Sequence, residues 1–64
     1  MKWQDARKIA IELAEKYPEI DPLTLRFTEL HQYVCDLETF EDDPQASNEG
    51  ILEAIQVAWI DETE

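Results

Sequence analysis

The sequence predicts a mainly α-helical fold: three helices with at most one very short pair of strands. Two observations lead to this prediction. In three segments of the 64-residue chain, apolar residues recur at the i, i+3, i+4 spacing of a helix with one buried face. Prolines and short acidic or polar runs separate these segments, as expected for turns. We expect residues 1–64 to form one modified winged-helix-like domain, in which the second connection is long enough to act as a wing-like loop.

The first helix is expected to open at Asp5, a good N-cap residue that follows Trp3 closely. Its apolar face comprises Ala6, Ile9, Ala10, Leu13 and Tyr17. Pro18 ends the helix, because the residue before a proline avoids the α region.

Residues 19–22 are predicted to form a turn, and residues 23–27 a short extended stretch that is a candidate strand. Thr28 is the expected N-cap of the second helix. The apolar stripe of this helix is Leu30, Tyr33, Val34 and Leu37. The residues expected to point away from the core are Gln32, Cys35 and Asp36.

Phe40 is expected to anchor the chain as it leaves the second helix, and residues 41–47 to form a surface loop. Ser47 or Asn48 caps the third helix. The core-facing residues of that helix are Ile51, Leu52, Ile55, Ala58 and Trp59. The acidic tail, residues 61–64, is expected to fray.

The net charge is concentrated in the second half of the chain. Sixteen acidic residues against five basic ones give a formal net charge of −11. Residues 1–32 contain six acids and five bases, a net charge of −1, whereas residues 33–64 contain ten acids and no base, a net charge of −10. Such a field repels phosphate backbones, so nucleic-acid binding is not expected. It favours basic protein surfaces and hard cations.

Catalysis is not expected from this set of residues. The single histidine and the single cysteine, His31 and Cys35, lie four residues apart on neighbouring positions that we expect to be exposed. No glycine elbow accompanies them, since the one glycine is Gly50. We interpret them as two unrelated surface residues, with a metal contact by His31, Cys35 and Asp36 as the alternative.

The sequence also predicts a compartment. No apolar run approaches the roughly 18 residues that a membrane-spanning helix needs. A lone cysteine without a signal peptide points to a reducing compartment, so we expect a cytoplasmic protein.

Clusters of carboxylates are the candidate binding residues. Closed zinc sites and EF-hand loops require ligand patterns that are missing here. Carboxylate clusters suit weak binding of divalent cations, and ferrous iron accepts such ligands. The candidate iron ligands are Glu38, Glu41, Asp42, Asp43, Glu49 and Glu53, with His31 and Cys35 as weaker candidates. The residues expected to contact a basic partner are Asp36, Glu38, Asp42, Asp43, Glu49 and Glu53. The alternative interpretation is a solvated acidic face that keeps a small protein in solution.

A series of short segments, in order along essentially the whole chain, resembles the IscX family, the small acidic proteins of bacterial iron–sulfur cluster assembly. No one segment is diagnostic, but the series together is highly specific. The segments are Lys2-Trp3 with Asp5, residues 17–22, residues 26–31, residues 35–37, residues 42–49, residues 52–55 and residues 59–62.

The resemblance implies a modified winged-helix fold and a monomer. It further implies binding to the cysteine desulfurase that supplies sulfur, at a basic surface also used by frataxin and ferredoxin. Ferrous iron (Fe²⁺) bound by surface carboxylates and a regulatory, adaptor-like role are also implied.

Two other functions remain alternatives at this point. A winged helix could bind DNA, but the third helix carries Glu49 and Glu53 and no Lys or Arg. An acidic mimic of nucleic acid, blocking some other basic enzyme and having no specific metal role, also fits the charge.

Overall fold

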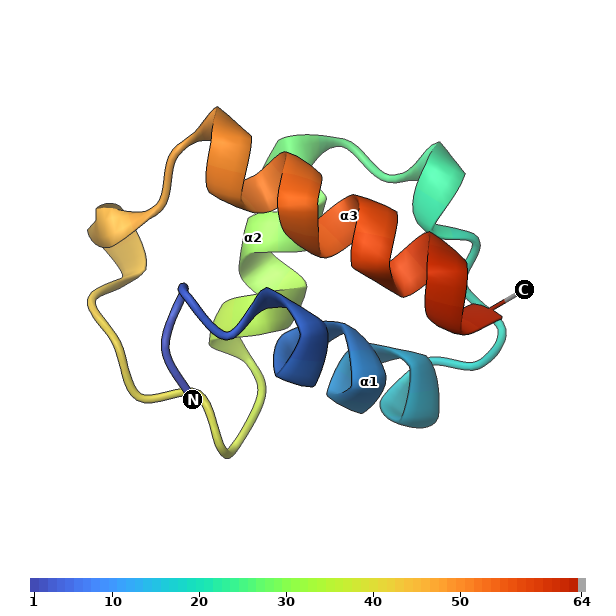
Figure 1. Ribbon diagram of the computed structural model, residues 1–64, viewed down its shortest axis with the longest axis horizontal. Helices are drawn as coiled ribbons and strands as arrows, with labels where there is room; N and C mark the ends of the chain where they lie inside the picture. Colours follow the sequence, from blue (N-terminus) through green and yellow to red (C-terminus); the bar gives the residue numbers. More distant parts are fainter. Residues whose placement is uncertain (64) are drawn as a thin grey trace.

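The computed structural model describes residues 1–63, which contain three α-helices and two short 3₁₀ turns. The helices are α1 (Ala6–Lys16), α2 (Phe27–Cys35) and α3 (Glu49–Thr63), and the turns are η1 (Pro22–Thr24) and η2 (Pro44–Ala46). Helix α3 packs most extensively against α1 and also against α2, which crosses behind both (Figure 1). Residues 1–63 contain no strand, so the prediction of a mainly helical domain is confirmed.

All three helices contribute to one hydrophobic core. The buried apolar residues are Trp3, Ile9, Ala10, Leu13, Leu30, Val34, Leu37, Leu52, Ile55 and Trp59. The helical members of this set belong to the predicted apolar stripes, because i, i+3, i+4 spacing places residues on one face. Trp3 is an addition, since the sequence placed it only in front of the first helix.

The N-cap residues of α1 and α3 use their side chains differently. Asp5 occupies the N-cap position of α1 as predicted, but its carboxylate accepts a hydrogen bond from the backbone N–H of Lys2 (3.1 Å) and none from the helix. Asn48 caps α3, because its Oδ1 accepts from the backbone N–H of Ile51 (3.0 Å). Of the two candidates for this cap, the structure therefore selects Asn48.

Helix α2 starts earlier than predicted. Arg26 is the N-cap residue, and the expectation that Thr28 holds this position is wrong. The reason is Glu29, whose Oε1 accepts a hydrogen bond from the backbone N–H of Arg26 (3.2 Å). A Glu at the third helical position commonly satisfies the N-cap amide in this way.

Of the extended stretch expected over residues 23–27, only Leu25 and Arg26 have extended backbone, and no strand forms, because Pro22 starts a 3₁₀ turn and α2 begins at Phe27. The carboxylate of Asp21 accepts a hydrogen bond from the backbone N–H of Leu23 (3.0 Å), which closes the turn. The Nε2 of Gln56 on α3 donates to the carbonyl of Pro22 (2.9 Å). This contact holds η1 against α3.

Helix α3 continues through residues 61–63, which were expected to fray. Its described part runs to Thr63, and Glu64 lies outside the described residues. Arg7 of α1 and Glu62 approach to 3.4 Å between Nη1 and Oε1, which is the one ion pair found within residues 1–63. The Arg7 side chain is 72% exposed, so water screens this pair and it adds little stability.

The connection between α2 and α3 contains the η2 turn and no hairpin within the described residues. The winged-helix part of the expectation therefore stays a prediction. None of the helices in residues 1–63 is both long and apolar enough to cross a membrane.

The core predicts different responses at two leucines. Leu13 is fully buried, whereas the Leu23 side chain is 70% exposed. Leu13→Ala should lower the free energy of unfolding by about 2–5 kcal/mol, because it leaves a cavity in the core. Leu23→Ala should change it by less than about 0.5 kcal/mol. Urea unfolding followed by circular dichroism, with sulfate added to keep Leu13→Ala folded at the start, measures both values. Equal losses would contradict this description of the core.

Candidate functional site

The N-terminal segment is fastened to the connection between α2 and α3. Trp3 is 2% exposed, and its indole Nε1 donates a hydrogen bond to the carbonyl of Asp43 (2.7 Å). The backbone N–H of Trp3 donates to Oδ2 of Asp42 (3.1 Å), and that of Glu41 donates to the carbonyl of Met1 (2.8 Å). These bonds fix the acidic loop, defined here as residues 41–47, against the start of the chain.

Aromatic packing strengthens this attachment. The Trp3 ring stacks on the ring of His31, with 5.3 Å between centroids and 27° between planes. Phe40 meets Trp3 edge to face at 4.7 Å. Phe40 is half-buried and packs against the core, in accord with its predicted role as an anchor.

His31 and Cys35 belong to the same set of contacts. Both are half-buried, so the prediction that they lie on exposed positions is wrong. The Nε2 of His31 donates a hydrogen bond to the carbonyl of Pro44, because a carbonyl oxygen can only accept. In a neutral ring Nδ1 is then an acceptor, and it faces the thiol of Cys35 at 3.8 Å. Burial, aided by the charge of Asp36, raises the pKa of that thiol. Both ring nitrogens of His31 are therefore used in contacts within the fold, and the side chain of Cys35 is a neutral thiol.

Two of the candidate carboxylates shape the acidic loop. Asp42 accepts hydrogen bonds from the backbone N–H groups of Trp3 and Asp43, the latter at 2.8 Å. These two bonds, with smaller help from Lys2 and the N-terminal amine, hold the pKa of Asp42 below its usual range. Asp43 caps η2, because its Oδ1 accepts from the backbone N–H of Gln45 (2.9 Å).

The other candidates stand on the surface. Glu38, Glu41, Glu49 and Glu53 are exposed, and their carboxylates make no hydrogen bond to the described residues. Within residues 1–63, no group of three or more His, Cys, Asp or Glu side chains converges on a point that could hold a metal ion. The donors therefore do not fit a closed iron cage, and weak iron binding stays a prediction.

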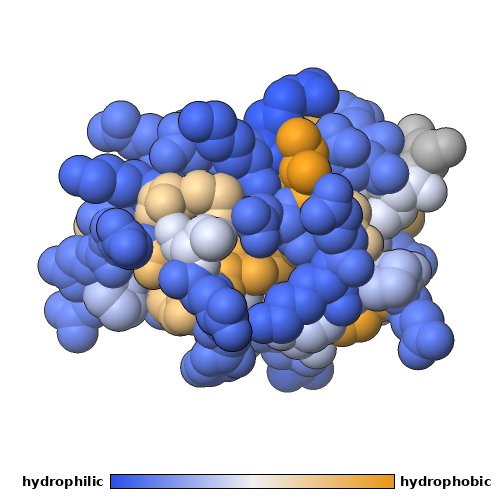
Figure 2. Space-filling view, turned by 90° about the horizontal axis from the view of Figure 1, so that it is seen from below, coloured by the Kyte–Doolittle hydropathy of each residue, from blue (hydrophilic) through white to orange (hydrophobic). Residues whose placement is uncertain are grey.

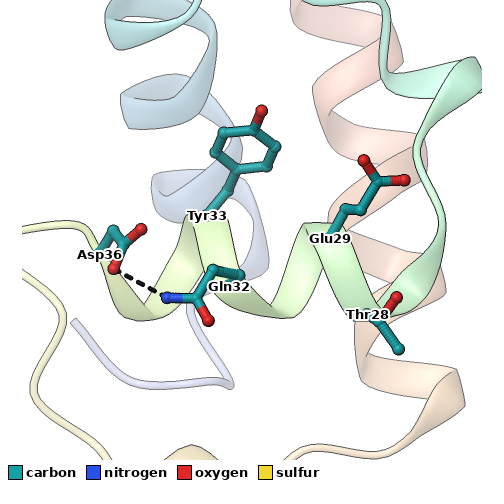
Figure 3. Close-up of a pocket in the computed structure, with 5 residues that line it drawn as sticks. All are labelled: Thr28, Glu29, Gln32, Tyr33 and Asp36. Atoms are coloured by element: carbon teal, nitrogen blue, oxygen red, sulfur yellow. Dashed lines mark hydrogen bonds between the residues drawn. The ribbon is translucent and has the colours of Figure 1, made fainter.

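A hollow on the outer face of α2 was not foreseen from the sequence. It has a volume of about 380 Å³, and its lining residues are Thr28, Glu29, Gln32, Tyr33 and Asp36. We call it the α2 groove. Figure 3 shows Tyr33 rising between Glu29 and Asp36, with the Nε2 of Gln32 donating to Oδ1 of Asp36 (3.0 Å). Only Asp36 was predicted to contact a partner. The spacing i, i+4, i+7 of Glu29, Tyr33 and Asp36 is the pattern that could have revealed the groove.

Few large apolar side chains are exposed in the part of the chain that the structure describes. Seen from the α1 side, hydrophilic side chains cover most of the face and leave apolar atoms exposed in small patches (Figure 2). The large apolar side chains exposed in the described chain are Ile11, Leu23 and Val57. Because no Lys or Arg follows Arg26, every charged side chain from Glu29 onward is anionic.

Two comparisons with known proteins give matches over essentially the whole chain. A family model described as iron–sulphur cluster assembly matches residues 1–64. A protein of Pseudomonas aeruginosa, described as uncharacterized, is 52% identical over 62 residues, which cover 97% of this chain and 94% of that relative.

The lowered pKa of Asp42 predicts a pH-dependent contribution to stability. A carboxyl group whose pKa is depressed by folding stabilises the protein above its unfolded pKa of about 3.9 and loses that contribution as the pH falls through the depressed value. Asp42→Asn should therefore destabilise the protein at about pH 7 and much less at about pH 3. Urea unfolding at both pH values measures the difference.

Glu41→Gln is the matched control, because it removes one charge from the same loop without removing a hydrogen bond. A loss of stability for Asp42→Asn that is the same at both pH values, or that equals the effect of Glu41→Gln, would contradict the role assigned to Asp42.

Proposed function

Because the chain belongs to the iron–sulphur cluster assembly family, we propose that it is an adaptor that binds the cysteine desulfurase of that pathway and regulates cluster assembly. The family supplies the pathway, and partners within it are proteins. The charge of this chain supports the choice of a partner with a basic surface.

The observation that carries the proposal is the single sign of charge in the second half of the chain, which comprises the end of α2, the acidic loop and α3. Residues 33–64 contain ten acids and no base. Like charges on one small domain repel one another and oppose the folded state. A single-sign surface is therefore costly for folding but useful for docking, because it speeds encounter with a cationic partner and disfavours anionic ones.

An accessory role suits the residues better than a catalytic one. The side chains with the most reactive chemistry, His31 and Cys35, are half-buried and contact each other, and His31 also binds the carbonyl of Pro44. A raised thiol pKa leaves less thiolate, the form that reacts. The adaptor is proposed to act through binding, as a monomer, since a net charge of −11 opposes self-association. Frataxin and ferredoxin are proposed to compete with it for the basic surface of the desulfurase.

Weak association with Fe²⁺ is a second part of the proposal. The exposed carboxylates of Glu38, Glu41, Glu49 and Glu53 are hard oxygen ligands of the kind that divalent iron accepts. They are spread along the surface and are not gathered in a cage. Iron is therefore proposed to exchange rapidly among them. Asp42 and Asp43 would contribute with the lone pairs that their loop hydrogen bonds leave free.

The docking proposal predicts a strong dependence on salt and on charge placement. Affinity for the purified desulfurase should fall at least about tenfold between about 50 mM and about 500 mM salt, because the screening length shortens over that range. At low salt, Glu49→Lys with Glu53→Lys should weaken binding by a similar factor. Isothermal titration calorimetry measures both effects.

Glu15→Lys with Glu19→Lys is the matched control, since it makes the same charge change on exposed residues of the first half of the chain. If the two double variants bind equally well, or if the affinity does not respond to salt, the proposed docking surface is wrong.

The iron proposal predicts a distributed effect of Fe²⁺ on amide NMR signals under anaerobic conditions. Paramagnetic broadening should appear around Glu38, Glu41, Glu49 and Glu53 without saturating at one equivalent. Glu49→Gln with Glu53→Gln should relieve it on α3 alone, because the other carboxylates are untouched. Saturable broadening centred on His31 and Cys35 would show a defined cage and would contradict the proposal.

A further inference from the structure

We propose that the α2 groove receives two cationic side chains of a partner segment, at least one of them an arginine. The inference rests on the proposed function only for the identity of the partner, the desulfurase. The chemistry of the ligand is argued from the groove itself.

The two carboxylates of the groove are held in place and each keeps an acceptor free. Oε1 of Glu29 accepts from the backbone N–H of Arg26, and Oδ1 of Asp36 accepts from Gln32. The second oxygen of each carboxylate makes no hydrogen bond to the described residues. These oriented oxygens face the groove from its two ends (Figure 3).

The side chain between the two carboxylates is an aromatic ring with a fixed position. Tyr33 packs edge to face against Tyr17, with 4.7 Å between centroids, and against Trp59 at 6.4 Å. Such contacts fix the ring before any ligand arrives, so its ordering costs nothing on binding. An aromatic face attracts cations, and arginine most readily, because a flat guanidinium can lie over the ring and pair with a carboxylate at once.

The spacing of the carboxylates suits two cationic side chains better than one metal ion. Glu29 and Asp36 are seven residues apart, which is about 10 Å along a helix axis. A metal ion held by both would have to lie about 2 Å from an oxygen of each, and no group of three or more His, Cys, Asp or Glu side chains in the described residues converges on such a point. Two long cationic side chains can each meet one carboxylate, and both carboxylates repel anions.

A partner segment with the pattern Arg-x-x-Arg matches this spacing. In the polyproline II conformation, residues three apart lie on the same side of the chain about 9 Å apart. One arginine would then meet Asp36 while its guanidinium covers Tyr33, and the second cation would meet Glu29. The hollow of about 380 Å³ is large enough for these side chains.

The test is an NMR titration of the ¹⁵N-labelled chain with the capped peptide Arg-Ala-Ala-Arg at about 0.15 M salt. We expect the largest shifts at Gln32, Tyr33 and Asp36. Arg-Ala-Ala-Ala and Lys-Ala-Ala-Lys should each bind at least about threefold more weakly, because they lack one cation or the flat guanidinium.

Glu29→Gln with Asp36→Asn should weaken binding of Arg-Ala-Ala-Arg about three- to tenfold. Both substitutions keep an oxygen that can accept the hydrogen bonds of Arg26 and Gln32, so the fold should be retained. Glu49→Gln with Glu53→Gln is the control of equal charge change outside the groove, and it should bind as the parent chain does. Equal affinities for the two double variants, or shifts centred on the acidic loop and α3, would overturn the proposal.

Tyr33→Leu tests the role of the aromatic ring independently. It should abolish the preference for arginine over lysine peptides, and a preference that persists in this variant would overturn the role of the ring.

Titration of the desulfurase separates this inference from the function on which it rests. If the parent chain does not bind the desulfurase, the proposed function fails, while the peptide titration still decides whether the α2 groove binds two cationic side chains. If the parent chain and Glu29→Gln with Asp36→Asn bind the enzyme equally, the proposed function stands and the groove is overturned as its docking site.

Discussion

The attachment of Trp3 to the acidic loop is the constraint on which the functional surface depends. The connection from α2 to α3 has little regular structure beyond η2. Its course is defined by hydrogen bonds to Trp3 and by the stack of Trp3 on His31. The two hydrogen bonds join residues 39 and 40 positions apart, so they close a long loop whose entropic cost is met by burying a large aromatic side chain. The hydrogen bond from His31 to the carbonyl of Pro44 is a second contact that fixes the acidic loop relative to α2.

The same contacts distinguish residues whose polar atoms hold the fold together from residues whose charges face the solvent. His31, Cys35, Asp42 and Asp43 have the chemistry that a sequence search notices first, yet their polar atoms bind neighbouring parts of the fold. The carboxylates left free lie on the surface, Glu49 and Glu53 on α3 and Glu38 and Glu41 in the connection between α2 and α3, and are simple charges. In a protein of the iron–sulphur cluster assembly family, free surface charges of this kind suit binding to a partner better than catalysis.

The apolar spacing in the sequence was sufficient to predict three helices and most of the core, because burial of one face is what gives a helix in a small domain its stability. It did not predict the start of α2 or the η1 turn. Those depend on single contacts, of Glu29 with Arg26, of Asp21 with Leu23 and of Gln56 with Pro22. Spacing does not encode such contacts. The α2 groove was missed for a related reason: Tyr33 was assigned to the core stripe, whereas it is half-buried and serves both core and groove.

The end of α3 gives salt two opposing effects. Asp61 and Glu62 lie at the carboxyl end of the helix, where the helix dipole is already negative, and the described residues supply only Arg7 to offset them. Counter-ions relieve this repulsion, so rising ionic strength favours the folded chain. The same ions weaken attraction to a cationic partner. Rising salt would therefore raise the stability of the folded chain and lower the fraction of chains bound to a partner. Chains released by salt would stay folded and could bind again on dilution.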